Sequence, residues 1–176
     1  TPLPVFHVNA LEFSFFCSLL SGAGLVLFEH FDLLRILKVL QREKITILSL
    51  IPQMVHLLAQ ESERFKASAG ESFRYVVTAA APLPPALARD WILKFGDQVR
   101  ILQGYGLSEA VNFSATMPTN LSFEVYRKLL LDFQRPSIGV ALEGNDILVV
   151  DEQGRLCGAE QIGEVCVRGA NVMLGY

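Results

Sequence analysis

The sequence predicts an α/β domain whose core is a mainly parallel sheet flanked by helices, followed by the start of a small β-rich subdomain. Two observations support this prediction. Helical and extended apolar patterns alternate with short links in residues 1–137, whereas strands follow one another without a helix in residues 138–176. Of the 176 residues, 51% are hydrophobic, which is enough to bury a core and excludes a disordered chain.

The first elements follow one another in order. Leu11 to Leu20 is apolar nearly all round and predicts a helix buried on most sides, and Leu25 to Phe28 predicts a short strand. Asp32 is expected to cap a helix whose apolar residues recur at helical spacing. The continuous β-branched run from Ile45 to Ile51 predicts a strand covered on both faces, and Pro52 then opens a helix.

The pattern of strand and helix then continues to the candidate site. The polar stretch from Glu61 to Glu71 is expected to be a surface connection, and Phe73 to Thr78 predicts the next strand. Pro84 and Pro85 begin another helix, and Val99 to Gln103 predicts another strand. Because one helix joins these two strands, we expect them to be parallel neighbours.

After Pro136 the pattern changes to paired strands. Asp146 to Asp151 and Glu164 to Arg168 predict an antiparallel pair with one wet face, joined by a turn-rich stretch. We expect this pair to be the beginning of a truncated β-rich subdomain.

Composition excludes several classes of function. The formal net charge is −3 and no basic run is present, so we expect no nucleic-acid partner. The three cysteines form no C-x-x-C pair, which argues against a disulfide framework or a zinc site and favours a reducing, cytoplasmic location. The longest uncharged run, Phe13 to Phe28, is too short for a transmembrane segment, since a bilayer takes roughly 20 apolar residues.

The candidate chemistry lies where two neighbouring strands end. One strand runs into Ala79-Ala80-Ala81-Pro82, where small side chains expose the backbone, and the other runs into Gly104 to Glu109. Ligands of open parallel sheets bind beyond such ends. Tyr105 can stack on a planar ring, Ser108 and the amides of a helix start can meet a phosphate, and Glu109 can hold Mg²⁺.

Other interpretations of this segment stay open. It can be a glycine turn in which Ser108 only caps a helix. Gly106 to Ala110 also comes within one residue of the G-x-S-x-G elbow of serine hydrolases, but that fold places its histidine after the serine, and every histidine here precedes Ser108. A serine hydrolase-like α/β domain is therefore the alternative from another reaction class. No Walker A or G-x-G-x-x-G pattern is present.

Four segments together resemble the adenylate-forming (AMP-binding) superfamily, which includes acyl-CoA synthetases, coumarate-CoA ligases, luciferases and peptide-synthetase adenylation domains. Gln103 to Ala110 resembles the family's Q-G-Y-G-x-T-E-A segment, and Pro4 to His7 resembles its P-x-F-H segment. Ala79 to Leu83 resembles its G-A-A-P-L or G-G-A-P-L loop, and Gly163 to Tyr176 resembles its G-E-[IV]-x-[VI]-x-G-x-x-x-x-x-G-Y stretch. The segments occur in the family's order over almost the whole chain.

The resemblance implies roles for the matching positions. Ser108 would contact the α-phosphate and Glu109 would ligate Mg²⁺, and these two are the candidate catalytic residues. Tyr105 would stack on adenine. His7 would lie beside the acyl tunnel, or would simply be a histidine hydrogen-bonded near a helix start. The implied nucleotide-binding positions are Ala80, Ala81, Pro82, Gln103, Gly104, Tyr105, Gly106 and Ser108. The implied substrate-binding positions are His7, Ala79 and Gly104.

Three departures from the family pattern stand out. Ser108 replaces the usual threonine and lacks the methyl group that limits its rotamers. Ala79 and Ala80 stand where glycine is common. The stretch from Asn120 to Arg135 has no counterpart in the family pattern.

The resemblance implies a ligase that uses ATP and Mg²⁺ to convert a small-molecule carboxylic acid to an acyl-adenylate, and then forms a thioester with coenzyme A. Amino-acid-activating relatives carry an Asp in F-D-x-x-x-x-E, where this chain has His7, so a buried ammonium would lack its counter-ion. A fatty or aryl acid is therefore favoured over the alternative, an amino-acid adenylation domain of a peptide synthetase. A non-catalytic nucleotide-binding scaffold is the further alternative. The family's phosphate loop and its lysine-bearing C-terminal domain would lie in N-terminal and C-terminal parts of the same chain, so residues 1–176 alone are expected to be inactive.

Overall fold

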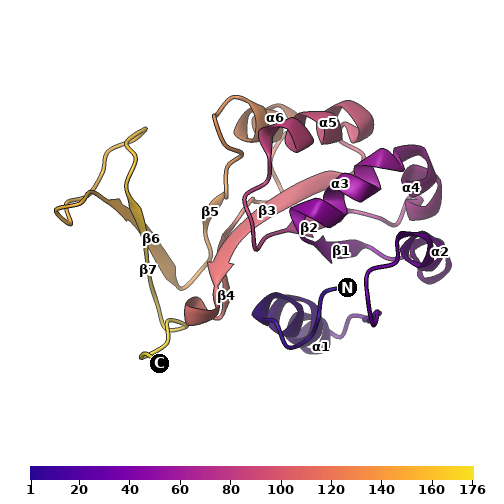
Figure 1. Ribbon diagram of the computed structural model, residues 1–176, viewed down its shortest axis with the longest axis horizontal. Helices are drawn as coiled ribbons and strands as arrows, with labels where there is room; N and C mark the ends of the chain where they lie inside the picture. Colours follow the sequence, from indigo (N-terminus) through magenta and orange to yellow (C-terminus); the bar gives the residue numbers. More distant parts are fainter.

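The computed structural model describes residues 1–176 apart from the side chain of Asn112. Its centre is a five-stranded sheet in the order β1-β2-β3-β4-β5 (Figure 1). The strands β1 (Ile47–Leu50), β2 (Tyr75–Thr78) and β3 (Arg100–Leu107) pair in parallel. The strands β4 (Asn112–Thr116) and β5 (Val140–Ala141) then extend the sheet antiparallel. The predicted parallel core is confirmed.

Helices lie on both faces of this sheet. The helices on the upper face in Figure 1 are α3 (Pro52–Gln60), α4 (Ser62–Ala69), α5 (Pro85–Phe95) and α6 (Phe123–Leu131). On the opposite face lie a π-helix, η1 (Asn9–Phe16), and its continuation α1 (Cys17–Ser21). The remaining helix, α2 (Leu33–Glu43), contacts α4. This two-sided cover leaves the carboxyl ends of β2 and β3 free to form a site.

Local sequence explains where several helices begin. Asp32 caps α2 as predicted, because its carboxylate accepts a hydrogen bond from the Arg35 N–H at 3.0 Å. Pro52 and Pro85 occupy the first turns of α3 and α5, where no hydrogen bond is lost. The only tryptophan, Trp91 on α5, is fully buried in the core.

The segment 120–135 contains α6. The buried Tyr126 joins this helix to β3: its hydroxyl accepts a hydrogen bond from the Ile101 N–H at 2.8 Å and donates one to the Ile101 carbonyl at 3.2 Å. Burial raises the pKa of Tyr126 far above its ordinary value, so the hydroxyl stays protonated and can donate. This part of the chain is therefore an integral layer of the fold.

Two predictions about helices are wrong. The polar stretch Glu61 to Glu71 contains α4, because Phe65 and Ala69 fall four residues apart and are both buried. The helix over residues 11–20 is present, but Leu19 and Leu20 are 66% and 85% exposed, so it is covered on one side only.

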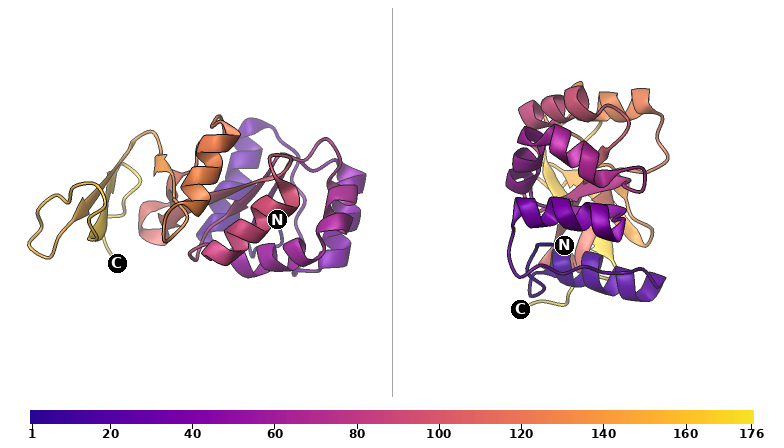
Figure 2. Two further views of the ribbon diagram at one scale, coloured as in Figure 1. Left: turned by 90° about the horizontal axis from the view of Figure 1, so that it is seen from above. Right: turned by 90° about the vertical axis from the view of Figure 1, so that its right-hand side faces the viewer.

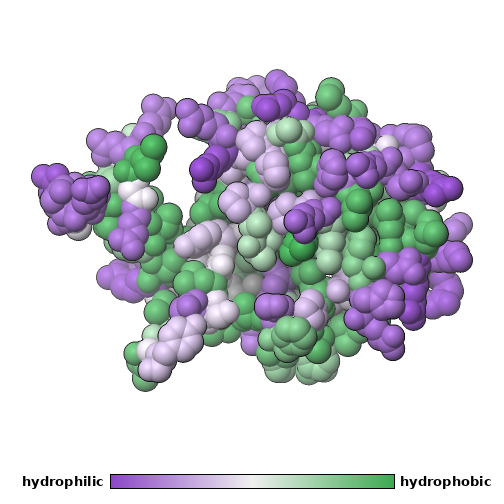
Figure 3. Space-filling model, viewed as in Figure 1, coloured by the Kyte–Doolittle hydropathy of each residue, from purple (hydrophilic) through white to green (hydrophobic). Residues whose placement is uncertain are grey.

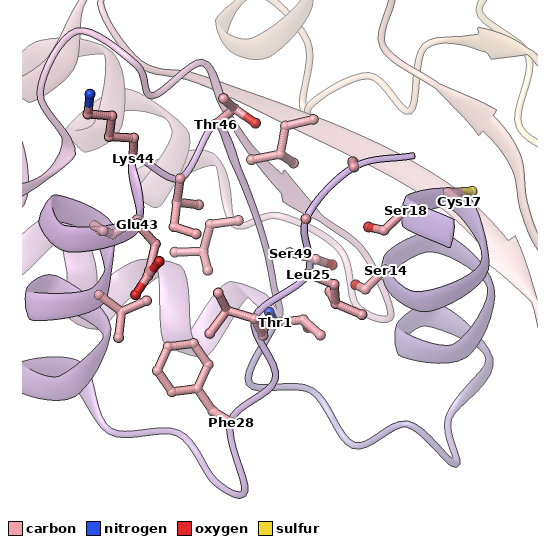
Figure 4. A pocket seen from close by; sticks show the side chains of 18 of the residues that line it. Thr1, Ser14, Cys17, Ser18, Leu25, Phe28, Glu43, Lys44, Thr46 and Ser49 are labelled. Atoms are coloured by element: carbon pink, nitrogen blue, oxygen red, sulfur yellow. Dashed lines mark hydrogen bonds between the residues drawn. The ribbon is translucent and has the colours of Figure 1, made fainter. Parts of the chain in front are cut away.

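The predicted strand from Leu25 to Phe28 is extended chain without a ladder partner in the sheet. It pairs instead with Thr1, whose amino group donates to the Val26 carbonyl at 2.6 Å and whose carbonyl accepts from the Phe28 N–H at 3.1 Å. A cavity of about 390 Å³ lies between this segment and β1, and Figure 4 shows Leu25 and Phe28 among its lining residues. An apolar run forms a strand only where a neighbouring edge takes its hydrogen bonds.

A second, two-stranded sheet projects from the first (Figure 2). Its strands β6 (Asn145–Val150) and β7 (Glu164–Gly169) are antiparallel, as predicted. The expectation of a single wet face is wrong for the described residues, since Leu148 and Val165 lie on opposite faces and both are exposed. The boundary between residues 137 and 138 stays a prediction.

Candidate functional site

The loop after β2 is held against β3 by a buried glutamine. The Oε1 of Gln103 on β3 accepts a hydrogen bond from the Leu83 N–H at 3.3 Å. Within this loop Ala79 is buried, whereas Ala81 and Pro82 are exposed. The predicted contact of Gln103 with the nucleotide stays a prediction. In the structure its side chain holds the exposed loop at the end of β3.

Ala80 has a backbone conformation that side chains rarely adopt. Its φ is +68°, in the left-handed region that favours glycine. Glycine is common at this position in the family pattern, and an alanine here stores backbone strain at the tip of the loop. Residues with such strain gather at functional sites.

The strand β3 extends further than predicted. The strand was expected to end at Gln103, but Gly104 to Leu107 continues β3 because β4 supplies an antiparallel partner. The register shifts between Tyr105 and Gly106, and such irregularities re-aim side chains next to active sites. A Cβ added to Gly104 would lie 2.4 Å from the ring of Phe113, so any other residue there would force that ring to move.

The hydroxyl and carboxylate expected to contact phosphate and metal follow directly. Ser108 to Ala110 forms a single 3₁₀ turn of three residues, so the expected helix start with a row of free amides is wrong. Ser108 is exposed and Glu109 is partly covered. Hydrogen bonds from its own backbone N–H and from the Tyr176 hydroxyl hold the pKa of the Glu109 carboxyl below its ordinary value. Glu109 is therefore an ionised acceptor at neutral pH.

The carboxylate of Glu109 can bind a Mg²⁺ ion that is held together with a nucleotide. Among the residues that the structure describes, no group of three or more His, Cys, Asp or Glu side chains could hold a metal. Mg²⁺ is commonly bound through one or two carboxylates, with phosphate and water oxygens completing its octahedron. Glu109 can supply that carboxylate, and the other ligands would come from the nucleotide and from water.

An apolar groove begins beside this turn. It is a cavity of about 520 Å³ between η1, α1 and the sheet, and we call it the apolar groove. The rings of Phe13 on η1 and Phe113 on β4 meet edge to face across it, with centroids 5.3 Å apart. Glu12 also lines the groove. The pKa of the nearby Cys17 thiol is raised, mainly by burial and to a smaller extent by the charge of Glu12. In Figure 3 apolar side chains also gather at the surface over η1 and α1.

His7 lies at the start of η1. Its backbone N–H donates to the Pro4 carbonyl and its carbonyl accepts from the Leu11 N–H, both at 3.0 Å. The side chain is exposed beside the ring of Phe6, outside the lining of the apolar groove. These contacts fit the histidine at a helix start, and its role beside an acyl group stays a prediction.

Three residues at the site were missed by sequence reasoning. Asn171, Met173 and Tyr176 each hydrogen-bond to Glu109 or Ala110. The pattern that ends in Gly175-Tyr176 was part of the family resemblance, but it carried no role. Contacts so distant along the chain cannot be inferred from spacing.

The model of the AMP-binding enzyme family matches residues 1–176. The chain belongs to the AMP-binding enzyme family. Among curated relatives it is 31% identical to 4-coumarate–CoA ligase 1 of Arabidopsis thaliana, over 99% of this chain and 30% of the relative. It is 32% identical to 4-coumarate–CoA ligase 3 of the same plant, with the same coverage. The chain thus spans about a third of the length of these relatives.

Solved structures of this family superimpose on the whole chain. O-succinylbenzoate coenzyme A synthetase from Bacillus subtilis, in complex with ATP and magnesium ion, matches with a TM-score of 0.80 and 27% identity over 100% of this chain and 33% of that one. ATP-bound MatB from Rhodopseudomonas palustris matches with a TM-score of 0.82 and 29% identity over 99% of this chain and 32% of that one. The AMP-binding fold predicted from the four segments is therefore confirmed.

Proposed function

We propose that the complete protein containing these residues is an AMP-forming acid–thiol ligase. The observation that supports this most directly is the stretch from Glu109 to Phe113. At one end it presents an ionised carboxylate suited to Mg²⁺, and at the other Val111 and Phe113 line the apolar groove. A charged triphosphate and an apolar acid can thus meet at one turn of the chain.

The proposed reaction uses the Glu109 carboxylate for the triphosphate and the apolar groove for the acid. An oxygen of the substrate carboxylate attacks the α-phosphorus of ATP, and the bond to pyrophosphate breaks, which leaves an acyl-adenylate. Tyr105 would stack on adenine, and the Ser108 hydroxyl would donate to an α-phosphate oxygen. Mg²⁺ on Glu109 would neutralise charge on the phosphates. The thiol of coenzyme A then attacks the acyl carbonyl and AMP leaves. Residues 1–176 contribute positioning and charge neutralisation.

The substrate class we propose is a fatty or aryl acid. Aromatic and aliphatic side chains form most of the groove wall, and His7 stands where amino-acid-activating relatives carry an aspartate. One observation favours the second candidate, an amino acid, because the carboxylate of Glu12 lines the groove and can pair with an ammonium. Glu12→Gln separates the two, since it would abolish activation of an amino acid and spare that of a fatty or aryl acid.

We further propose that residues 1–176 alone do not catalyse and that the complete protein is cytoplasmic. The first proposal is supported by the length of the curated relatives, of which this chain spans about a third. The second is supported by the three cysteines, all of which are free. Within the described chain no helix is long and apolar enough to cross a membrane.

Glu109→Ala in the complete protein tests the proposed function. Loss of a metal-binding carboxylate is expected to lower acid-dependent ATP–pyrophosphate exchange by about 100-fold and to leave the thermal unfolding curve unchanged. The matched control is Glu143→Ala, which removes an exposed carboxylate outside the turn of Glu109. If folding is lost together with exchange, or if both variants retain exchange, Glu109 does not have the proposed role.

A further inference from the structure

The chain that follows β7 contacts the turn of Glu109 at three points. The Tyr176 hydroxyl donates to Glu109 Oε1 at 2.8 Å, and the Met173 N–H donates to the Glu109 carbonyl at 2.8 Å. The Asn171 Nδ2 donates to the Ala110 carbonyl at 2.6 Å. We call residues 171–176 the clamp segment. It joins the small sheet to the candidate metal ligand across more than 60 residues of sequence.

A glycine at the end of β7 allows the clamp segment to reach this turn. A Cβ added to Gly169 would lie 2.4 Å from Asn171 Oδ1 and 2.8 Å from Asn145 Oδ1. The Gly169 carbonyl also accepts a hydrogen bond from the Val172 N–H at 3.2 Å, which turns the chain. Gly169 therefore gives the Asn171 amide the space in which it bonds to Ala110.

We propose that the clamp segment is a positioning device for Glu109, in which Asn171 holds the backbone of the turn and Tyr176 orients the carboxylate toward Mg²⁺·ATP. This inference rests on the proposed function. An ionised carboxylate offers about four lone-pair positions on two oxygens. Tyr176 occupies one position on Oε1 and the backbone N–H of Glu109 takes another, so about two positions stay available to a cation.

The physical gain comes from restricting the carboxylate before the nucleotide binds. A free glutamate side chain loses rotamer freedom when it binds a ligand, and this loss weakens binding. A side chain already held by Tyr176, on a backbone held by Met173 and Asn171, has less freedom to lose. Partners that orient a metal ligand typically change metal affinity or activity by 10- to 100-fold.

Tyr176→Phe tests this role because it removes one hydroxyl and little else. In the complete protein, Mg²⁺ is titrated at a fixed ATP concentration and binding is followed by calorimetry. We expect the affinity for Mg²⁺·ATP to fall about tenfold, with the affinity for ATP in EDTA unchanged. In steady-state assays the KM for Mg²⁺·ATP is expected to rise while the KM for the acid stays constant. Leu174→Ala is the matched control, since that side chain is fully exposed within the same segment.

Hydrogen exchange supplies a second measurement that does not depend on catalysis. The Met173 amide, which donates to the Glu109 carbonyl, is expected to exchange faster in Asn171→Ala than in the wild type. A purely structural role for Tyr176 would lower the unfolding temperature and leave the ratio of the two KM values unchanged.

The possible outcomes separate the inference from the proposed function. If wild-type protein binds Mg²⁺·ATP and Tyr176→Phe binds it equally well, the positioning role is wrong and the proposed function stands. Tighter binding by Tyr176→Phe would also overturn the inference, because it would mean that the hydroxyl competes with the cation. If wild-type protein binds no Mg²⁺·ATP, the proposed function falls and the inference falls with it.

Discussion

Ala80→Gly is expected to stabilise the chain, although glycine usually destabilises. Ala80 lies at an exposed position of the loop after β2 with φ +68°. Its neighbour Ala81 is also exposed and is not among the residues with positive φ. The two alanines therefore form a matched pair: they have the same side chain and lie in the same loop, but only Ala80 has a positive φ.

The size of the effect follows from two opposing contributions. A left-handed conformation costs a non-glycine residue about 1–2 kcal/mol, and glycine removes this strain. Glycine also loses more conformational freedom on folding, which costs about 0.5–1 kcal/mol. Ala80→Gly is thus expected to raise the free energy of unfolding by about 0.5–1 kcal/mol. Ala81→Gly relieves no strain and is expected to lower it by about 0.5–1 kcal/mol.

Urea unfolding of the chain measures both variants. The fluorescence of Trp91, the only tryptophan, reports loss of the core because its ring is buried and its Nε1 donates to the Val99 carbonyl. The midpoint is expected to rise for Ala80→Gly and to fall for Ala81→Gly, with an unchanged slope. If Ala80→Gly lowers the midpoint as much as Ala81→Gly does, Ala80 is not strained and the reasoning is refuted.

Three further predictions concern the core, the groove and a thiol. Tyr126→Phe is expected to lower the free energy of unfolding by about 1–3 kcal/mol in the same urea titration, because a buried backbone N–H of β3 loses its acceptor. Gly104→Ala is expected to push the ring of Phe113 into the apolar groove and to raise the KM for the acid in the complete protein. Burial and the nearby Glu12 raise the pKa of the Cys17 thiol, so alkylation of Cys17 is expected to require a higher pH than alkylation of an unperturbed cysteine. Glu12→Gln is expected to shift the pH profile of this alkylation back to lower pH.

The predictions for the groove and for the Cys17 thiol can each be checked against a stated outcome. A Cβ added at Gly24 would meet no atom within 4 Å, so Gly24→Ala should leave the KM for the acid unchanged. If Gly24→Ala and Gly104→Ala raise the KM equally, the clash with Phe113 is not the cause. Alkylation is followed by mass spectrometry of the Cys17 peptide. An unchanged pH profile in Glu12→Gln would contradict the electrostatic contribution of Glu12.

Local patterns were sufficient to predict most of the core. The β-branched runs around β1 and β2, the Asp32 cap and the prolines before α3 and α5 each determine structure through nearby residues. Predictions failed where a distant partner decides. The segment from Leu25 to Phe28 has strand composition, but no sheet edge accepts it, and the end of β3 became a strand because β4 pairs with it.

In the candidate site too, features set by neighbouring residues were predictable from the sequence, and features set by distant contacts were not. The residue types that suit a nucleotide, Tyr105, Ser108 and Glu109, are visible in one short segment of sequence. The left-handed backbone of Ala80 is not visible there, because alanine rarely adopts it. The clamp segment is also invisible, since its hydrogen bonds join residues more than 60 positions apart.

Acid-dependent ATP–pyrophosphate exchange by the complete protein tests the central claim most directly. The assay compares a fatty acid, an aryl acid such as 4-coumarate and an α-amino acid, each with Mg²⁺ present and with Mg²⁺ removed by EDTA. We predict exchange with a fatty or an aryl acid, none with the amino acid, and none without Mg²⁺. Absence of exchange with every acid, together with absence of ATP binding, would contradict the assignment of this site to acyl-adenylate formation.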